Sequence, residues 1–214
     1  MIRSLGVSAS LAGLAVAATL VGCSATSPYM HPVVGPSMVA PPEGEAAVVF
    51  LRRATACDYG SWFLVIDEHG HYVGDSMPGS TFAVTYPAGD HAFFAWDPDA
   101  ELDVERYPYL NQVGAVRAQL DAGRTYVVTV GTQQSPFGER GRTCSPYPWV
   151  HLKLVPLESV SGVLSETKTF VPDRAAGEAV IARDRALIER HVGMGMAKLV
   201  ADPRTPPPAP PATP

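Results

Sequence analysis

The sequence is poor in positive charge. Its 214 residues include 16 Lys and Arg against 21 Asp and Glu, which gives a formal net charge of −5. No run or stripe of basic residues is present that could neutralise the phosphates of a nucleic acid. The composition therefore predicts a protein without a nucleic-acid partner.

Common catalytic motifs are also missing. The chain has no Gly-x-Ser-x-Gly, no His-Glu-x-x-His and no glycine-rich phosphate-binding loop. A catalytic site can still assemble from residues that are scattered along the sequence. We therefore expect a non-catalytic protein without a cofactor, and keep a hydrolase with dispersed catalytic residues as the alternative.

No charged side chain occurs between Arg3 and His31, and this stretch contains the apolar run Leu5–Val21. A short positive start followed by such a run is typical of a secretory signal peptide. The run is also long enough to cross a bilayer as a helix. It ends in Leu20-Val21-Gly22-Cys23, which resembles the lipobox of bacterial lipoproteins. The alternative is an uncleaved N-terminal helix in which Cys23 is incidental.

The lipobox resemblance implies that residues 1–22 are a signal peptide, cleaved between Gly22 and Cys23. It also implies a thioether-linked diacylglycerol on the Cys23 sulfur and an acyl chain such as palmitate on its amino group. Several acyl chains at one residue anchor a protein stably to a membrane. Ser24 follows the cysteine where Asp would imply retention at the inner membrane, so we expect an outer-membrane lipoprotein facing the periplasm.

Cysteine is scarce, with three residues in the chain. If Cys23 carries lipid, Cys57 and Cys144 remain as an even pair in an oxidising compartment, and we expect them to form a disulfide. A bridge closing a loop of this length would stabilise the fold by about 4.5 kcal/mol in the chain-entropy account. The alternative is two free thiols that lie too far apart to meet.

Proline is plentiful, with 21 residues, but many lie near the two ends of the chain. Residues 23–44 are proline-rich, nearly uncharged and without periodicity, which predicts a flexible tether that lifts a domain several nanometres off the bilayer. The terminal PRTPPPAPPATP predicts a disordered tail over residues 201–214.

The middle of the chain alternates apolar and polar residues with a period of two, and Gly, Pro and Asp mark the turns. No helix-length period separates these runs, so the sequence predicts a mainly β fold, an antiparallel β-sandwich of seven to eight strands over residues 45–158. The long connections should carry any binding surface. The predicted strands are residues 46–53, 61–67, 71–75, 80–86, 91–97, 113–120, 125–131 and 149–155.

Residues 159–200 are predicted to be a linker and a C-terminal amphipathic helix. Over residues 173–192, Ile181, Ile188 and Val192 share one side, and Asp173 is placed to cap the start. Gly193 and Gly195 should weaken or end the helix, although the following MAKLVA could continue it. The helix either covers one sheet, packs against a sheet edge or binds a partner.

Three segments resemble an uncharacterised family of bacterial envelope lipoproteins with a PEGA-like sandwich. They are EAAVVFLRR, YPAGDHAFFA and LDAGRTYVVTVG, and their order and spacing carry the resemblance, which covers residues 45–131. The resemblance implies a β-sandwich in the cell envelope and brings no established reaction.

Three groups of residues are candidate sites by residue type. His69 and His71 flank a turn glycine and would suit a metal ion, although polar turn residues are the commoner explanation. We expect His91 to bond turn backbone rather than act as a base. An acidic run resembles a calcium loop, but Leu102 and Pro108 replace its Gly and Glu, which favours a solvated loop. Its acids are Asp97, Asp99, Glu101, Asp103 and Glu105. No metal site is therefore expected.

Aromatic residues gather near the long connections, where they can bind sugars or proteins or cap the ends of a core. They form the predicted partner surface: Trp96, Tyr107, Tyr109, Tyr147 and Trp149. The sequence thus predicts a lipid-anchored envelope protein whose β-sandwich is a binding or accessory module for envelope proteins or glycans.

Overall fold

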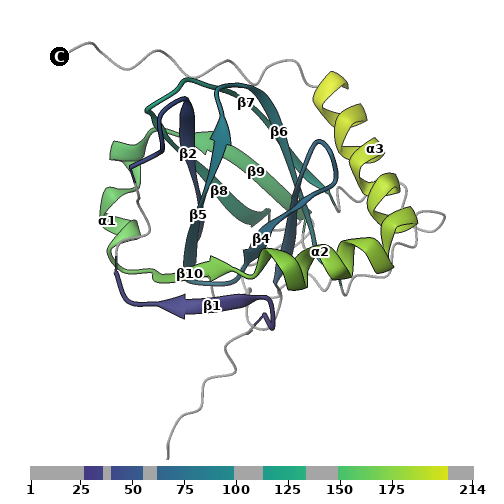
Figure 1. Cartoon of the computed structure of the whole chain (residues 1–214), viewed down its shortest axis with the longest axis horizontal. Coiled ribbons are helices and arrows are strands. Elements are labelled where there is room, and N and C mark those ends of the chain that lie inside the picture. The colour runs from purple at the N-terminus through teal and green to yellow at the C-terminus, as the bar shows by residue number, and fades with distance from the viewer. Residues whose placement is uncertain (1–26, 36–39, 55–61, 99–112, 134–148, 202–214) are drawn as a thin grey trace, which may run out of the picture.

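Two β-sheets lie face to face, and two helices cover the outer side of the smaller sheet (Figure 1). The computed structural model describes residues 27–35, 40–54, 62–98, 113–133 and 149–201. The larger sheet has the strand order β1-β10-β5-β2-β8-β9, and the smaller one has the order β4-β3-β6-β7. The strands are β1 (Met30–Val33), β2 (Glu45–Arg52), β3 (Phe63–Asp67), β4 (Tyr72–Ser76), β5 (Ser80–Pro87), β6 (Gly89–Trp96), β7 (Gly114–Leu120), β8 (Thr125–Gln133), β9 (Trp149–Val155) and β10 (Lys168–Pro172).

The mainly β fold and the β-sandwich are confirmed. The eight predicted strands are β2 to β9, and their alternation places the expected side chains in the core. In β7, Val116, Ala118 and Leu120 are buried, whereas Arg117 and Gln119 are exposed. Phe50, Phe82 and Phe93 meet in the same core between the sheets, where the rings of Phe50 and Phe82 stack with centroids 5.0 Å apart.

The larger sheet is mixed rather than wholly antiparallel. β2 pairs with β8 in parallel, and β10 pairs with β5 in parallel, while the remaining neighbours are antiparallel. Parallel neighbours need a long crossover, which in most folds is a helix. Here the chain from β2 to β8 passes through all four strands of the smaller sheet instead. The sequence shows no crossover helix for this reason.

Two strands lie where the sequence predicted a tether and a linker. β1 pairs antiparallel with β10 in the register Met30↔Pro172 to Val33↔Thr169. The prediction of a flexible segment over residues 23–44 is therefore wrong at residues 30–33. The Met30 side chain is buried, and the backbone N–H of Asp173 donates to the Tyr29 carbonyl at 2.8 Å. One buried methionine gives too weak a period for a strand to be recognised.

The C-terminal helix is two helices, α2 (Arg174–Arg183) and α3 (Arg185–Ala201), which meet at Asp184. Asp173 caps α2 as expected, since its Oδ1 accepts the Ala176 N–H at 3.0 Å. Ile181 and Ile188 are buried and Val192 is partly buried against the outer face of the smaller sheet, which bears Leu64, Ile66 and Phe94. The interpretation of a helix laid over one sheet is confirmed.

Gly193 and Gly195 do not end the C-terminal helix, and the alternative that MAKLVA continues it is confirmed. α3 continues through both residues. A Cβ atom on Gly195 would lie 2.2 Å from Phe94 Cδ1, and one on Gly177 in α2 would lie 2.1 Å from Tyr72 Cδ1. These two glycines have no side chain because the helices lie directly on aromatic rings of the sheet.

The outer face of the larger sheet is partly covered by two short helices, the 3₁₀ helix η1 (Leu157–Ser159) and α1 (Ser161–Leu164). Val160, between them, is buried with Val49, Leu51 and Val127. Among the residues that the structure describes, no helix has both the length and the apolar character needed to cross a membrane.

Candidate functional site

All of the predicted modification sites fall outside the described residues. The structure therefore leaves the signal cleavage, the lipidation and the disulfide as predictions. The same holds for three aromatic residues and four acids of the predicted loops. The residues concerned are Gly22, Cys23, Cys57, Cys144, Tyr107, Tyr109, Tyr147, Asp99, Glu101, Asp103 and Glu105.

Trp96 does not belong to a partner surface, and that prediction is wrong for this residue. Its side chain is 2% exposed and lies beneath α3. The indole stacks on the ring of His191, with centroids 4.5 Å apart and planes 21° apart. Trp96 therefore fills the layer between the smaller sheet and α3. Trp149 begins β9 opposite Gln133.

His69 and His71 lie in a tight turn between β3 and β4. Both backbone N–H groups donate to Asp67 Oδ1 at 2.9 Å, and Gly70 takes a positive φ of 77°. The two imidazoles are 70% and 65% exposed. In the described part of the chain, no group of three or more His, Cys, Asp or Glu side chains could hold a metal ion.

His91 makes the backbone contact that the sequence predicted. Its Nε2 lies 3.0 Å from the Pro87 carbonyl oxygen, across the turn between β5 and β6. Its Nδ1 lies 3.0 Å from Glu68 Oε1, and Glu68 Oε2 accepts the Ala92 N–H. The ring therefore ties the β5–β6 turn to the β3–β4 turn.

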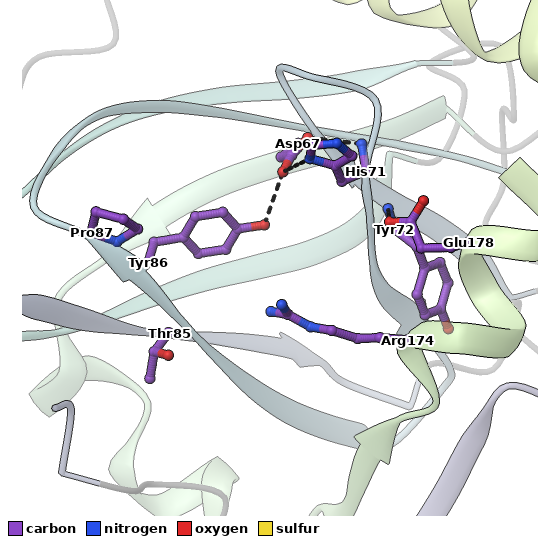
Figure 2. A pocket seen from close by; sticks show the side chains of 8 residues that line it. All are labelled: Asp67, His71, Tyr72, Thr85, Tyr86, Pro87, Arg174 and Glu178. Carbon is purple, nitrogen blue, oxygen red and sulfur yellow. Dashed lines mark hydrogen bonds and ion pairs between the residues drawn. The ribbon is translucent and has the colours of Figure 1, made fainter. Parts of the chain in front are cut away.

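A polar pocket lies where the start of α2 approaches these turns (Figure 2). Its volume is about 420 Å³, within the range of small-molecule sites. Three segments contribute to its wall: the β3–β4 turn, the end of β5 and the first turn and a half of α2. The lining residues are Asp67, His71, Tyr72, Thr85, Tyr86, Pro87, Arg174 and Glu178.

Arg174 and Glu178 lie four residues apart on α2, so both side chains lie on the same face of the helix. Figure 2 shows Arg174 extending from the start of α2 toward Tyr86 and Thr85. Within the described residues, Arg174 makes no hydrogen bond or ion pair. Glu178 Oε1 accepts the Tyr72 backbone N–H at 2.8 Å, which fixes that carboxylate at the pocket wall. Its Oε2 accepts no hydrogen bond from the described residues.

The carboxylate oxygens of Asp67 already have partners within the pocket wall. Besides the two turn N–H groups on Oδ1, its Oδ2 lies 3.5 Å from both the Tyr86 hydroxyl and His71 Nδ1. Burial, and then the negative charge of Asp67, raise the pKa of Tyr86, while Arg174 opposes the shift. The Tyr86 hydroxyl therefore keeps its proton and acts as a donor. Arg174 and Glu178 Oε2 are the groups left to bind a ligand.

A second polar cluster lies on the other side of Tyr72. The Asp75 carboxylate is fully buried and accepts a hydrogen bond from Ser27 Oγ, while its Oδ1 has no partner among the described residues. Burial raises the pKa of Asp75 to about 7, against the opposing hydrogen bonds from Ser27 and Tyr72. The thioether of Met30 accepts the Asp75 backbone N–H at 3.3 Å. This cluster fastens the segment before β1 to β4.

Sequence reasoning missed the pocket because its parts are far apart along the chain. Asp67 and Tyr86 come from the sandwich, whereas Arg174 and Glu178 come from a helix that the sequence identified only as a cover or a partner-binding element. An Arg and a Glu four residues apart, directly after the helix cap, were the one local signal.

Comparisons with known proteins assign no family to this chain. No protein-family model matches the chain, and no curated protein matches its sequence. The resemblance to PEGA-like envelope lipoproteins stays a prediction from the three sequence segments.

Proposed function

We propose that this protein is a lipid-anchored component of a bacterial envelope, and that its β-sandwich is a non-catalytic module that binds cell-wall glycan in the polar pocket. The lipobox-like tetrad ending at Cys23 supports the anchor. The resemblance of the sandwich segments to envelope lipoproteins supports the compartment.

One observation carries the binding site. Arg174 extends into a pocket of about 420 Å³ without a salt bridge to any described residue, while Glu178 is held beside it by the Tyr72 N–H. A guanidinium binds a carboxylate through two parallel hydrogen bonds. A carboxylate oxygen accepts from hydroxyl or amide groups.

The ligand that fits carries a carboxylate at one end and several O–H or N–H donors at the other. Acidic amino sugars and short peptides attached to them, the units of a cell wall, have this chemistry. The Tyr86 ring beside Arg174 adds an apolar surface on which the face of a sugar can pack.

Replacing Arg174 by alanine should weaken the binding of soluble cell-wall fragments about 10- to 100-fold, because charge-assisted hydrogen bonds contribute about 1.5–3 kcal/mol. Titration calorimetry with the detergent-solubilised protein and disaccharide–peptide fragments measures the change. Arg185→Ala is the matched control, since Arg185 is an exposed arginine at the start of α3 and outside the pocket. Equal affinity of the two variants, or no binding by the parent protein, would contradict the glycan site.

Replacing Cys23 by serine should abolish lipidation and move the protein from the membrane fraction to the soluble fraction. Mass spectrometry of the N-terminal peptide and detergent phase separation measure these two results. The Cys57→Ser protein is the control, because that residue is not preceded by a lipobox-like tetrad. An unmodified parent protein that still begins at Met1 would overturn the anchor.

The alternative function is an envelope hydrolase, and one contact favours it. His71 Nδ1 lies 3.5 Å from Asp67 Oδ2 at the pocket wall, an arrangement that can serve a general base. Against it, Asp67 already accepts two backbone N–H groups, and the neighbouring Tyr86 is held protonated. Release of cell-wall fragments by the parent protein and not by His71→Ala would establish the hydrolase.

A further inference from the structure

The chain just before β1 is fixed to the body of the protein. Ser27 is 6% exposed, and its hydroxyl donates to the buried carboxylate of Asp75. Its backbone N–H donates to the Met77 thioether at 3.3 Å. Three residues further on, Met30 is buried in the core between the sheets. Ser27 is therefore a fixed point of the folded part.

This fixed point lies four residues after Cys23. Four extended residues reach at most about 14 Å. If Cys23 carries acyl chains, as the proposed function requires, Ser27 lies within that distance of the lipid, and this inference rests on that proposal. A tether over residues 23–44 would have allowed a separation of several nanometres. The folded part is thus held against the bilayer surface.

β1, which begins three residues after Ser27, and its neighbour β10 carry exposed apolar side chains. Among the described residues, the large hydrophobic side chains that remain exposed are Val33, Val34 and Val171, with exposed fractions of 41%, 108% and 49%. Val33 and Val171 lie on the outward side of the β1–β10 pair, because Met30 and Phe170 on the other side face the core. β1 is the outermost strand of the larger sheet (Figure 1).

We propose that the β1–β10 edge, formed by residues 30–34 and 168–172, rests on the membrane surface with Val33, Val34 and Val171 at the level of the lipid headgroups. Apolar side chains at that depth are removed from water. A partner peptide that adds a strand to β1 is disfavoured, because β1 has four residues and Pro32 lacks an N–H.

Tryptophan fluorescence in vesicles of phosphatidylethanolamine and phosphatidylglycerol tests this orientation. The acylated full-length protein carries Val34→Trp, and part of the lipid is brominated on the acyl chain near the headgroup. After subtraction of the emission of the parent protein, bromolipid should quench the added fluorescence by about half, as expected for an indole at the headgroup boundary.

Lys153→Trp is the matched control. Lys153 is exposed on β9, the opposite edge of the same sheet, and its added emission should not be quenched. Equal quenching of the two variants, or none at Val34→Trp, overturns the inference. Crosslinking of vesicle-bound copies through β1 without quenching would also overturn it, in favour of a second copy at this edge.

Two further measurements, flotation with the vesicles and the mass of the N-terminal peptide, distinguish a failure of this inference from a failure of the proposed function. A protein that floats and carries lipid on Cys23, but shows no quenching at Val34→Trp, retains its anchor and loses the orientation. A protein without lipid that stays at the bottom of the gradient overturns the anchor itself.

Discussion

Replacing Gly195 by alanine should destabilise the protein by about 1–3 kcal/mol, the usual cost of forcing extra volume into a packed interior. The added methyl carbon would lie 2.2 Å from Phe94 Cδ1 and 2.7 Å from Cε1. Phe94 is fully buried between the smaller sheet and α3, so its ring has no free space to enter. Urea denaturation followed by circular dichroism measures the loss.

Gly193 provides a control two residues away in the same helix. A Cβ atom there would meet nothing within 4 Å. Gly193→Ala should therefore raise the stability by about 0.5–1 kcal/mol, because alanine has the higher helix propensity. If both substitutions stabilised the protein to the same extent, α3 would not lie on Phe94.

The free energy of unfolding should fall as the pH rises from about 4 to about 7, because of Asp75. Its pKa is about 7 in the folded protein and about 3.8 in the unfolded chain, since burial disfavours the charged form. Across this window the folded state keeps a proton that the unfolded state has released. The contribution is on the order of 4 kcal/mol, fully present below pH 4 and lost above pH 7.

Asp75→Asn should remove this pH dependence, because the amide keeps the shape of the side chain and does not ionise. Urea denaturation at pH 5 and at pH 8 gives the difference for each protein. Asp90→Asn, an exposed carboxylate on β6, should retain the slope of the parent protein. A slope in Asp75→Asn equal to that of the parent protein would show that Asp75 is not the titrating group.

The sandwich was predictable from sequence because its strands are short apolar runs bounded by turn residues, and this pattern located β2 to β9 correctly. In β7 the buried and exposed side chains also alternate, whereas β2, β3 and β4 are buried on both faces. β1 and β10 were missed because they are short and bury few side chains, so their patterns resemble those of linkers. The parallel pairings were not predictable, since neighbouring strands in space are set by the whole chain rather than by local periodicity.

The candidate site was less predictable than the fold. The helix signal at Asp173 and the turn signal at Gly70 were each correct, but nothing local indicates that these two points meet. Trp96 is a second case in which the local sequence does not show which distant element lies next to a residue. An aromatic residue next to a long loop suggested an exposed surface, whereas α3 covers it.

β1 is the first of the described strands to be synthesised, but it is the last that can pair, because its partner β10 is the last of these strands in the chain. Within the described residues, β1 pairs with β10 alone, and His31 lies 3.5 Å from Asp173, a residue 142 positions later in the chain. Contacts between such distant parts form slowly. Until β10 has been synthesised, β1 has no strand to pair with and the Met30 side chain cannot be buried in the completed core. In a nascent chain, β1 should therefore stay unpaired until β10 has been synthesised.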